Sequence, residues 1–68
     1  MKIIIDSMKI AAIMAQKGFT QAEIAKRGGL SSYGVARILK NKSCTCIAAG
    51  KLATALGVDI RDIMKGEE

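Results

Sequence analysis

The chain of 68 residues has no histidine, proline or tryptophan, and its only aromatic residues are one phenylalanine and one tyrosine. A core must therefore be built from Ile, Leu, Val, Met and Ala, and this composition without proline suits packed helices. A domain of this size buries only about 60% of its unfolded surface, so its stability is marginal and dimerisation would help it. We expect one small helical domain spanning residues 1–68.

Long apolar runs are also missing. The longest stretches, residues 3–5 and 10–15, are far shorter than the roughly 20 residues that cross a bilayer. The N-terminal residues lack the apolar run and the small-residue cleavage site of a secretory signal. We therefore expect a cytoplasmic protein with no membrane attachment.

The residues needed for a metal centre or an active site are scarce. Cys44 and Cys46 are the only cysteines, and without histidine they cannot complete a four-ligand zinc site within one chain. Ser31 and Ser32 have no histidine to act as a base, and no glycine-rich phosphate loop is evident. We expect no catalytic residue, metal or cofactor, with one cysteine in the core and the other near the start of a helix.

The positive charge of the chain is concentrated in its middle. The net charge is +5, but residues 17–51 contain seven Lys or Arg and one acid, Glu23. Basic side chains that neutralise phosphates release counterions and so gain affinity, which favours a polyanionic partner. The alternative is a solvated basic surface that serves only solubility.

Capping residues divide the chain into helices. Asp6 or Ser7, Ser31, Thr45 and Asp59 can begin helices, and Thr20 with Glu23 forms a capping box. With Gly18, Gly28-Gly29 and Gly57 as stops, the pattern predicts five helices at about residues 7–17, 20–27, 32–40, 46–56 and 59–65. In the fourth, Ile47, Leu52 and Leu56 should face inward. Residues 3–5 are β-branched and predict either a short strand or an extension of the first helix. The expected fold class is all-α.

Residues 20–40 have the side-chain sizes that a helix-turn-helix requires. Ala25 is small where the two helices approach, Gly29 suits the turn, and Ile24, Leu30, Val35 and Ile38 can face the core. The helical period then places the polar residues of the second helix of this pair on its outer side. These residues are Ser32, Tyr33, Arg37 and Lys40, with Ala36 among them.

The chemistry of that outer side suits DNA. Ser32 and Tyr33 can reach base edges in a major groove, Arg37 can bind guanine or phosphate, and Lys40 suits phosphate. Arg37 could instead pair with Glu23 and serve the fold. Gly34 costs about 1 kcal/mol in a helix, which suggests a close approach to the preceding helix or to DNA.

At these positions the sequence resembles the phage Cro and lambda-repressor-like family, the xenobiotic-response-element type of helix-turn-helix regulator. The motif is carried by Thr20-Gln21-x-Glu23-Ile24-Ala25, Gly29-Leu30-Ser31, Val35-x-x-Ile38 and Ala55-Leu56-Gly57-Val58. The resemblance implies a compact five-helix domain that binds double-stranded DNA. It also implies binding as a homodimer to near-palindromic operators and transcriptional regulation.

The resemblance also implies a set of DNA-binding residues. They are Gln21, Ser31, Ser32, Tyr33, Arg37, Lys40, Asn41 and Lys42. Two departures from the family pattern matter: Met14 and Leu39 replace a common Arg–Glu pair and should touch, and Asn41 stands where glycine is common and should accept a left-handed conformation. Ile60, Ile63, Met64 and the segment 3–5 are candidates for the dimer surface. The competing interpretations are nonspecific nucleic-acid binding and a protein-interaction module, such as an antitoxin or a modulator of a larger repressor, with a protein partner.

Overall fold

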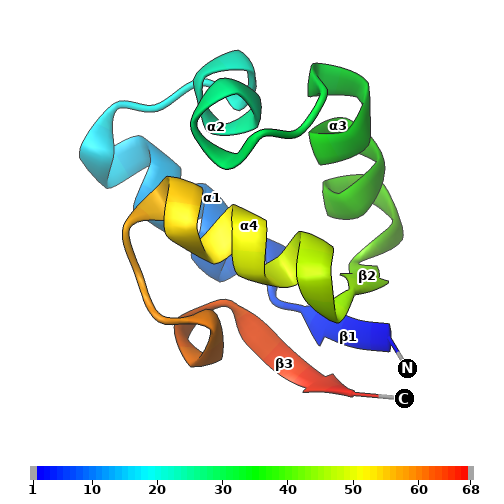
Figure 1. Ribbon diagram of the computed structural model, residues 1–68. Helices are drawn as coiled ribbons and strands as arrows, with labels where there is room; N and C mark the ends of the chain where they lie inside the picture. Colours follow the sequence, from blue (N-terminus) through cyan, green and yellow to red (C-terminus); the bar gives the residue numbers. More distant parts are fainter. Residues whose placement is uncertain (1, 68) are drawn as a thin grey trace.

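The computed structural model describes residues 2–67 of the chain. Figure 1 shows a cluster of helices with a small sheet at one end. The elements are β1 (Lys2–Ile5), α1 (Ser7–Lys17), α2 (Gln21–Gly28), α3 (Ser32–Asn41), β2 (Ser43–Thr45), α4 (Cys46–Leu56), the single-turn 3₁₀ helix η1 (Ile60–Asp62) and β3 (Met64–Glu67).

The expected all-α fold with five helices is wrong in its C-terminal part. Asp59 caps a turn as expected, and it forms a capping box with Asp62, but this turn ends at Asp62 and the chain continues as β3. β3 pairs antiparallel with β1, and β2 pairs with the other edge of β1. The ambiguous segment 3–5 is thus the central strand of a sheet. Its backbone groups find partners on both sides, which a helical C-terminus could not supply.

The predicted helix starts are confirmed by their capping hydrogen bonds. Asp6, Ser31 and Thr45 each accept a hydrogen bond from the backbone N–H three residues on, and Thr20 and Glu23 bond reciprocally. The left-handed residue after α3 differs from the prediction. Asn41 is the last helical residue, and Lys42 takes φ 59°, because the helix extends one residue further than expected.

The core lies between the helices and one face of the sheet. Its largest fully buried side chains are Ile5, Ile10, Ile24, Val35, Leu52, Leu56 and Ile63. The inward orientation of Leu52 and Leu56 is confirmed, whereas that predicted for Ile47 is wrong, since this side chain is 74% exposed in the first turn of α4. Met14 and Leu39 line the same shallow pocket.

Close packing of α2 on α4 fixes the base of the helix-turn-helix. Ala25 is buried, and a Cβ placed on Gly28 would lie 2.9 Å from the carbonyl oxygen of Lys51 and 3.2 Å from the Cβ of Ala55. Only glycine allows the backbones to approach so closely here. Within residues 2–67, no helix has the length and apolar character needed to cross a membrane.

Candidate nucleic-acid interface

The turn between α2 and α3 is built by local hydrogen bonds. Gly29 adopts φ 69°, and the N–H of Leu30 donates to the carbonyl of Ala25 at 2.8 Å. The hydroxyl of Ser31 then accepts from the N–H of Gly34 at 2.9 Å and begins α3. A Cβ on Gly34 would lie 3.0 Å from that hydroxyl oxygen, so the close approach suggested by this glycine is to its own cap rather than to α2.

The inner side of α3 is buried and its outer side is exposed. Val35 and Ile38 belong to the core, which fixes how the helix is rotated about its axis. The predicted outer residues Ser32, Tyr33, Ala36, Arg37 and Lys40 are all exposed. α3 therefore presents a polar and basic side with nothing from the described chain covering it.

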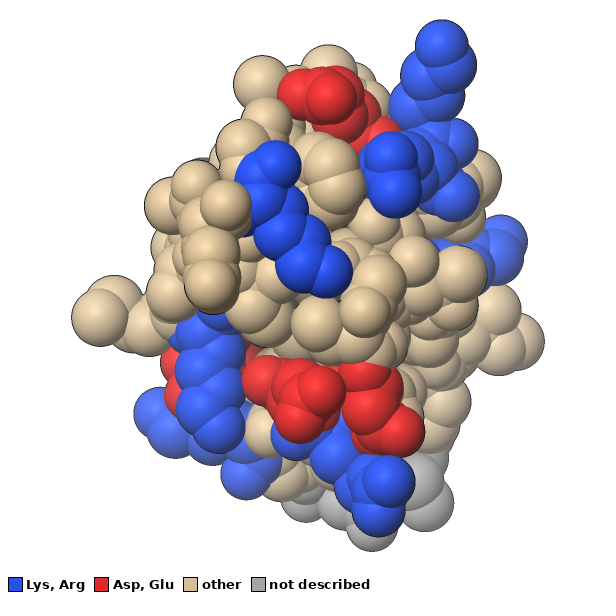
Figure 2. Space-filling view, turned by 90° about the vertical axis from the view of Figure 1, so that its left-hand side faces the viewer, with Lys and Arg blue, Asp and Glu red and all other residues tan. Residues whose placement is uncertain are grey.

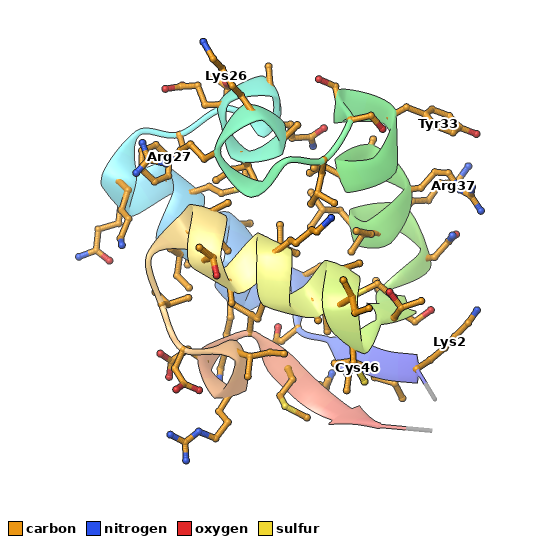
Figure 3. All side chains as sticks on the ribbon, viewed as in Figure 1. Lys2, Lys26, Arg27, Tyr33, Arg37 and Cys46 are labelled. Atoms are coloured by element: carbon orange, nitrogen blue, oxygen red, sulfur yellow. The ribbon has the colours of Figure 1, made fainter. Side chains whose placement is uncertain are left out.

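Tyr33 and Arg37 point away from the body of the protein on the same side (Figure 3). Tyr33 is 73% exposed, and the guanidinium carbon of Arg37 lies 5.8 Å from the centre of its ring. The alternative pairing of Arg37 with Glu23 is not observed, since the Glu23 carboxylate accepts from the backbone and the hydroxyl of Thr20. An aromatic and a cation so exposed contribute little to the core.

The remaining predicted residues border α3. Gln21 is the first residue of α2 and is exposed next to Met14 and Leu39. Asn41 and Lys42 are exposed at the end of α3, and Ser31 is exposed although its oxygen serves as the cap. The structure thus brings the predicted residues of α3 and its two ends to the surface.

Two of the central cations belong to the fold rather than to this surface. The ammonium of Lys17 donates to the carbonyl of Leu56 at 2.7 Å, and Nε of Arg27 donates to the carbonyl of Ala55 at 3.2 Å. Both satisfy carbonyls at the C-terminal end of α4, where the helix dipole favours positive charge. Arg27 also lies over the ring of Phe19, 4.4 Å from its centre.

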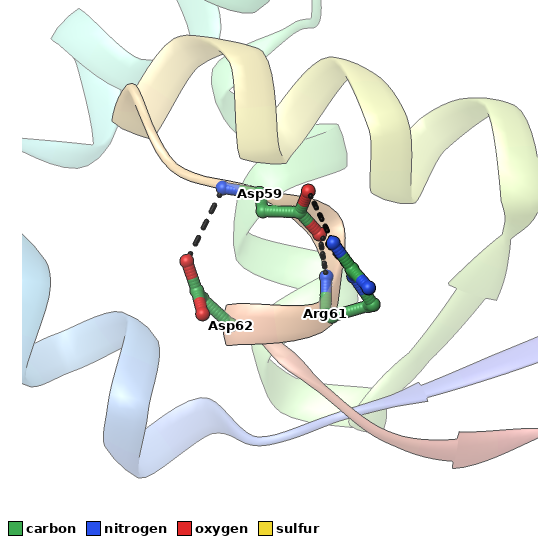
Figure 4. Close-up of polar contacts among 3 residues, drawn as sticks. All are labelled: Asp59, Arg61 and Asp62. Atoms are coloured by element: carbon green, nitrogen blue, oxygen red, sulfur yellow. Dashed lines mark hydrogen bonds and ion pairs between the residues drawn. The ribbon is translucent and has the colours of Figure 1, made fainter.

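The face of the molecule turned away from α3 has mixed charge. Figure 2 shows acidic and basic side chains next to one another on that face. Figure 4 shows one such contact, in which Asp59 accepts hydrogen bonds from the side chain and the backbone of Arg61. These bonds lower the pKa of the Asp59 carboxyl. The residue stays ionised and its charge is balanced locally.

The interface predicted from the sequence leaves out Lys2, Ser43 and Thr45. They line a groove beside α3 together with Arg37 and Asn41. No local pattern could have indicated this, because Lys2 reaches the groove only through the pairing of β1 with β2.

The two cysteines take the predicted positions. Cys44 is buried in β2, and burial together with the neighbouring Cys46 raises the pKa of its thiol, whereas Cys46 is exposed at the start of α4. The described residues contain no group of three or more His, Cys, Asp or Glu side chains arranged to hold a metal ion.

Two helices joined by a tight turn, with the second exposing a polar and basic side, define a helix-turn-helix DNA-binding domain. The model of the Cro/C1-type helix-turn-helix DNA-binding domain family matches residues 9–67, and the chain belongs to this family. It is accordingly a DNA-binding transcription regulator. No curated protein and no solved structure matches the chain significantly.

Proposed function

We propose that this regulator reads a specific operator in double-stranded DNA by placing α3 in the major groove. The observation that carries the proposal is the exposed outer side of α3, which has no role in the core. The inner side of the same helix is packed in the core through Val35 and Ile38. A rigid helix that presents Ser, Tyr, Arg and Lys has the donors and acceptors that base edges and phosphates require.

Each predicted residue has a role in this proposal. Ser32 and Tyr33, in the first turn of α3, contact base edges, and Arg37 binds guanine or phosphate one turn later. The remaining contacts are to the DNA backbone and fix the register of the domain. We assign them to Gln21, Ser31, Lys40, Asn41 and Lys42.

We further propose binding as a homodimer to two half-sites about one helical turn, ~34 Å, apart. Three of the residues expected at the dimer surface, Ile3, Ile5 and Ile63, are buried within the chain and are left out of this proposal. Of the predicted residues, Ile4, Ile60 and Met64 retain partial exposure, and they are the ones that we propose for the contact between protomers.

Selection of bound sequences from a random duplex library at two salt concentrations tests the proposal. We expect a near-palindromic sequence, and the same selection with a Tyr33→Ala, Arg37→Ala variant should lose it or alter it. Retention of DNA at low salt without any enriched sequence would indicate nonspecific binding instead.

A protein-interaction module is the second candidate, and two exposed apolar side chains favour it. Met8 is 81% exposed and Ile47 is 74% exposed, and a bound partner protein would remove this apolar surface from water. Failure of the parent protein to retain DNA at any salt concentration would favour this candidate over the operator-binding function.

A further inference from the structure

A groove of about 340 Å³ runs between α3 and the β1–β2 edge of the sheet. Its polar lining residues come from three elements, β1, α3 and β2: Lys2, Arg37, Asn41, Ser43 and Thr45. The described residues that line it include two cations and no acid. The basic surface therefore does not end with α3 but continues across β2 to β1.

Lys2 is held at this groove by the sheet. Lys2 pairs with Thr45 in the register of β1 and β2, and the N–H of Ile5 at the other end of β1 donates to the carbonyl of Lys42 at 3.0 Å. These contacts tie the N-terminal strand to the turn that follows α3. The position of Lys2 relative to α3 is thus set by folding, so binding has to order only its side chain.

The side chain of Lys2 is exposed and extends toward the same side of the molecule as Tyr33 and Arg37 (Figure 3). It makes no hydrogen bond or ion pair with the described part of the chain. A lysine in this situation is a compact, mobile positive charge that can bind a phosphate without requiring one fixed geometry.

We propose that Lys2 binds a phosphate of the DNA backbone in the same complex in which α3 occupies the major groove. This inference rests on the proposed function. It adds to the helix-turn-helix a contact from β1 that is remote in sequence. Because a phosphate carries no base information, Lys2 contributes to affinity and register and not to the choice of sequence.

The test compares the parent with Lys2→Gln on the selected duplex and on an unrelated duplex over a range of salt concentrations. Loss of one phosphate contact lowers the slope of log affinity against log salt by about 1. The affinity advantage of the parent should therefore shrink by about 3.5-fold between about 50 mM and about 200 mM salt. Both duplexes should lose affinity to a similar extent.

Two further variants make the result specific to the position of Lys2. Lys2→Arg should keep the parental slope, since it retains the charge. Lys26→Gln removes the same charge from α2, on a side chain that points away from the α3 side (Figure 3), and should leave the slope nearly unchanged. Thermal melting of each variant confirms that the fold is intact.

The outcomes separate the two proposals. Sequence-specific binding by the parent with an unchanged slope in Lys2→Gln would overturn the role of Lys2 and leave the proposed function standing. An equal decrease in slope for Lys2→Gln and Lys26→Gln would also overturn it, because the effect would then follow net charge alone. Absence of specific binding by the parent would reject the proposed function itself.

Discussion

Two groups of cations in this small protein have opposite roles. Lys17 and Arg27 bind carbonyls at the end of α4, whereas Arg37, Lys40 and Lys42 are exposed on α3 and at its end. All five lie in the same basic stretch of sequence, and the charge pattern does not separate them. The net charge of the chain therefore overstates the number of cations available to bind DNA, because some of these cations stabilise the fold instead.

Removing the outer side of α3 should have the largest effect. We expect Tyr33→Ala combined with Arg37→Ala to lower affinity for the selected duplex by about 2–4 kcal/mol, since each lost base contact costs about 1–3 kcal/mol. The melting temperature should hardly change, because both side chains are exposed. Fluorescence anisotropy and thermal melting measure the two quantities. If the double variant kept the affinity and sequence preference of the parent, the exposed side of α3 would not be the DNA-binding surface.

Gly28→Ala should have the next largest effect, now on stability. The added methyl group would meet the carbonyl oxygen of Lys51 at 2.9 Å, and forcing α2 away from α4 costs about 1–3 kcal/mol. Urea unfolding measures the change. Gly50→Ala is the matched control, because its Cβ would meet nothing within 4 Å and alanine favours a helix by about 0.5–1 kcal/mol. A similar change in both variants would contradict this account of the α2–α4 contact.

Arg27→Gln and Lys17→Gln should each lower the free energy of unfolding by about 0.5–1 kcal/mol, because α4 loses a hydrogen bond and a favourable charge at its C-terminal end. DNA affinity should change little. Lys26→Gln removes the same charge next to Arg27 and serves as the control in urea unfolding. The distinction between the two groups of cations fails if Arg27→Gln weakens DNA binding as strongly as a substitution on α3.

Lys42→Gly should have the smallest effect on stability. It should raise the free energy of unfolding and weaken DNA binding. Lys42 has φ 59°, so glycine relieves strain and we expect a gain of about 0.5 kcal/mol in the free energy of unfolding. Loss of the charge should lower the salt slope of DNA binding by about 1. Lys42→Gln keeps the strain and should lower the slope without the gain. A lower melting temperature for Lys42→Gly would show that the lysine stabilises this turn in another way.

The helix-turn-helix could be predicted because its determinants are local. Each cap joins residues three apart. The turn needs a positive φ at Gly29, and glycine adopts it easily because it has no side chain. The outer residues of α3 followed from the helical period once Val35 and Ile38 were placed inside. Sequence patterns are reliable when the interacting groups are neighbours in the chain.

The errors lie where distant segments meet. The apolar residues 60–64 suit a helix face, yet β3 forms because β1 offers it backbone partners about sixty residues away in the sequence. Ile47 was expected inside because its helical period permits it, but Ile47 lies on the outer side of the first turn of α4, where Ala49 takes the buried position. The C-terminal end of α3 was also predicted one residue too early. The left-handed conformation therefore falls on Lys42 and not on Asn41.

The helix starts, the turn between α2 and α3, and the polar side of α3 follow from the sequence, because short-range hydrogen bonds and the helical period decide these features. Which cations stabilise α4, which cations remain exposed and the position of Lys2 beside α3 depend on the folded chain. Carbonyl groups at a helix end and backbone groups of a strand form hydrogen bonds with whichever partners lie close to them in space. That proximity exists only after the chain has folded.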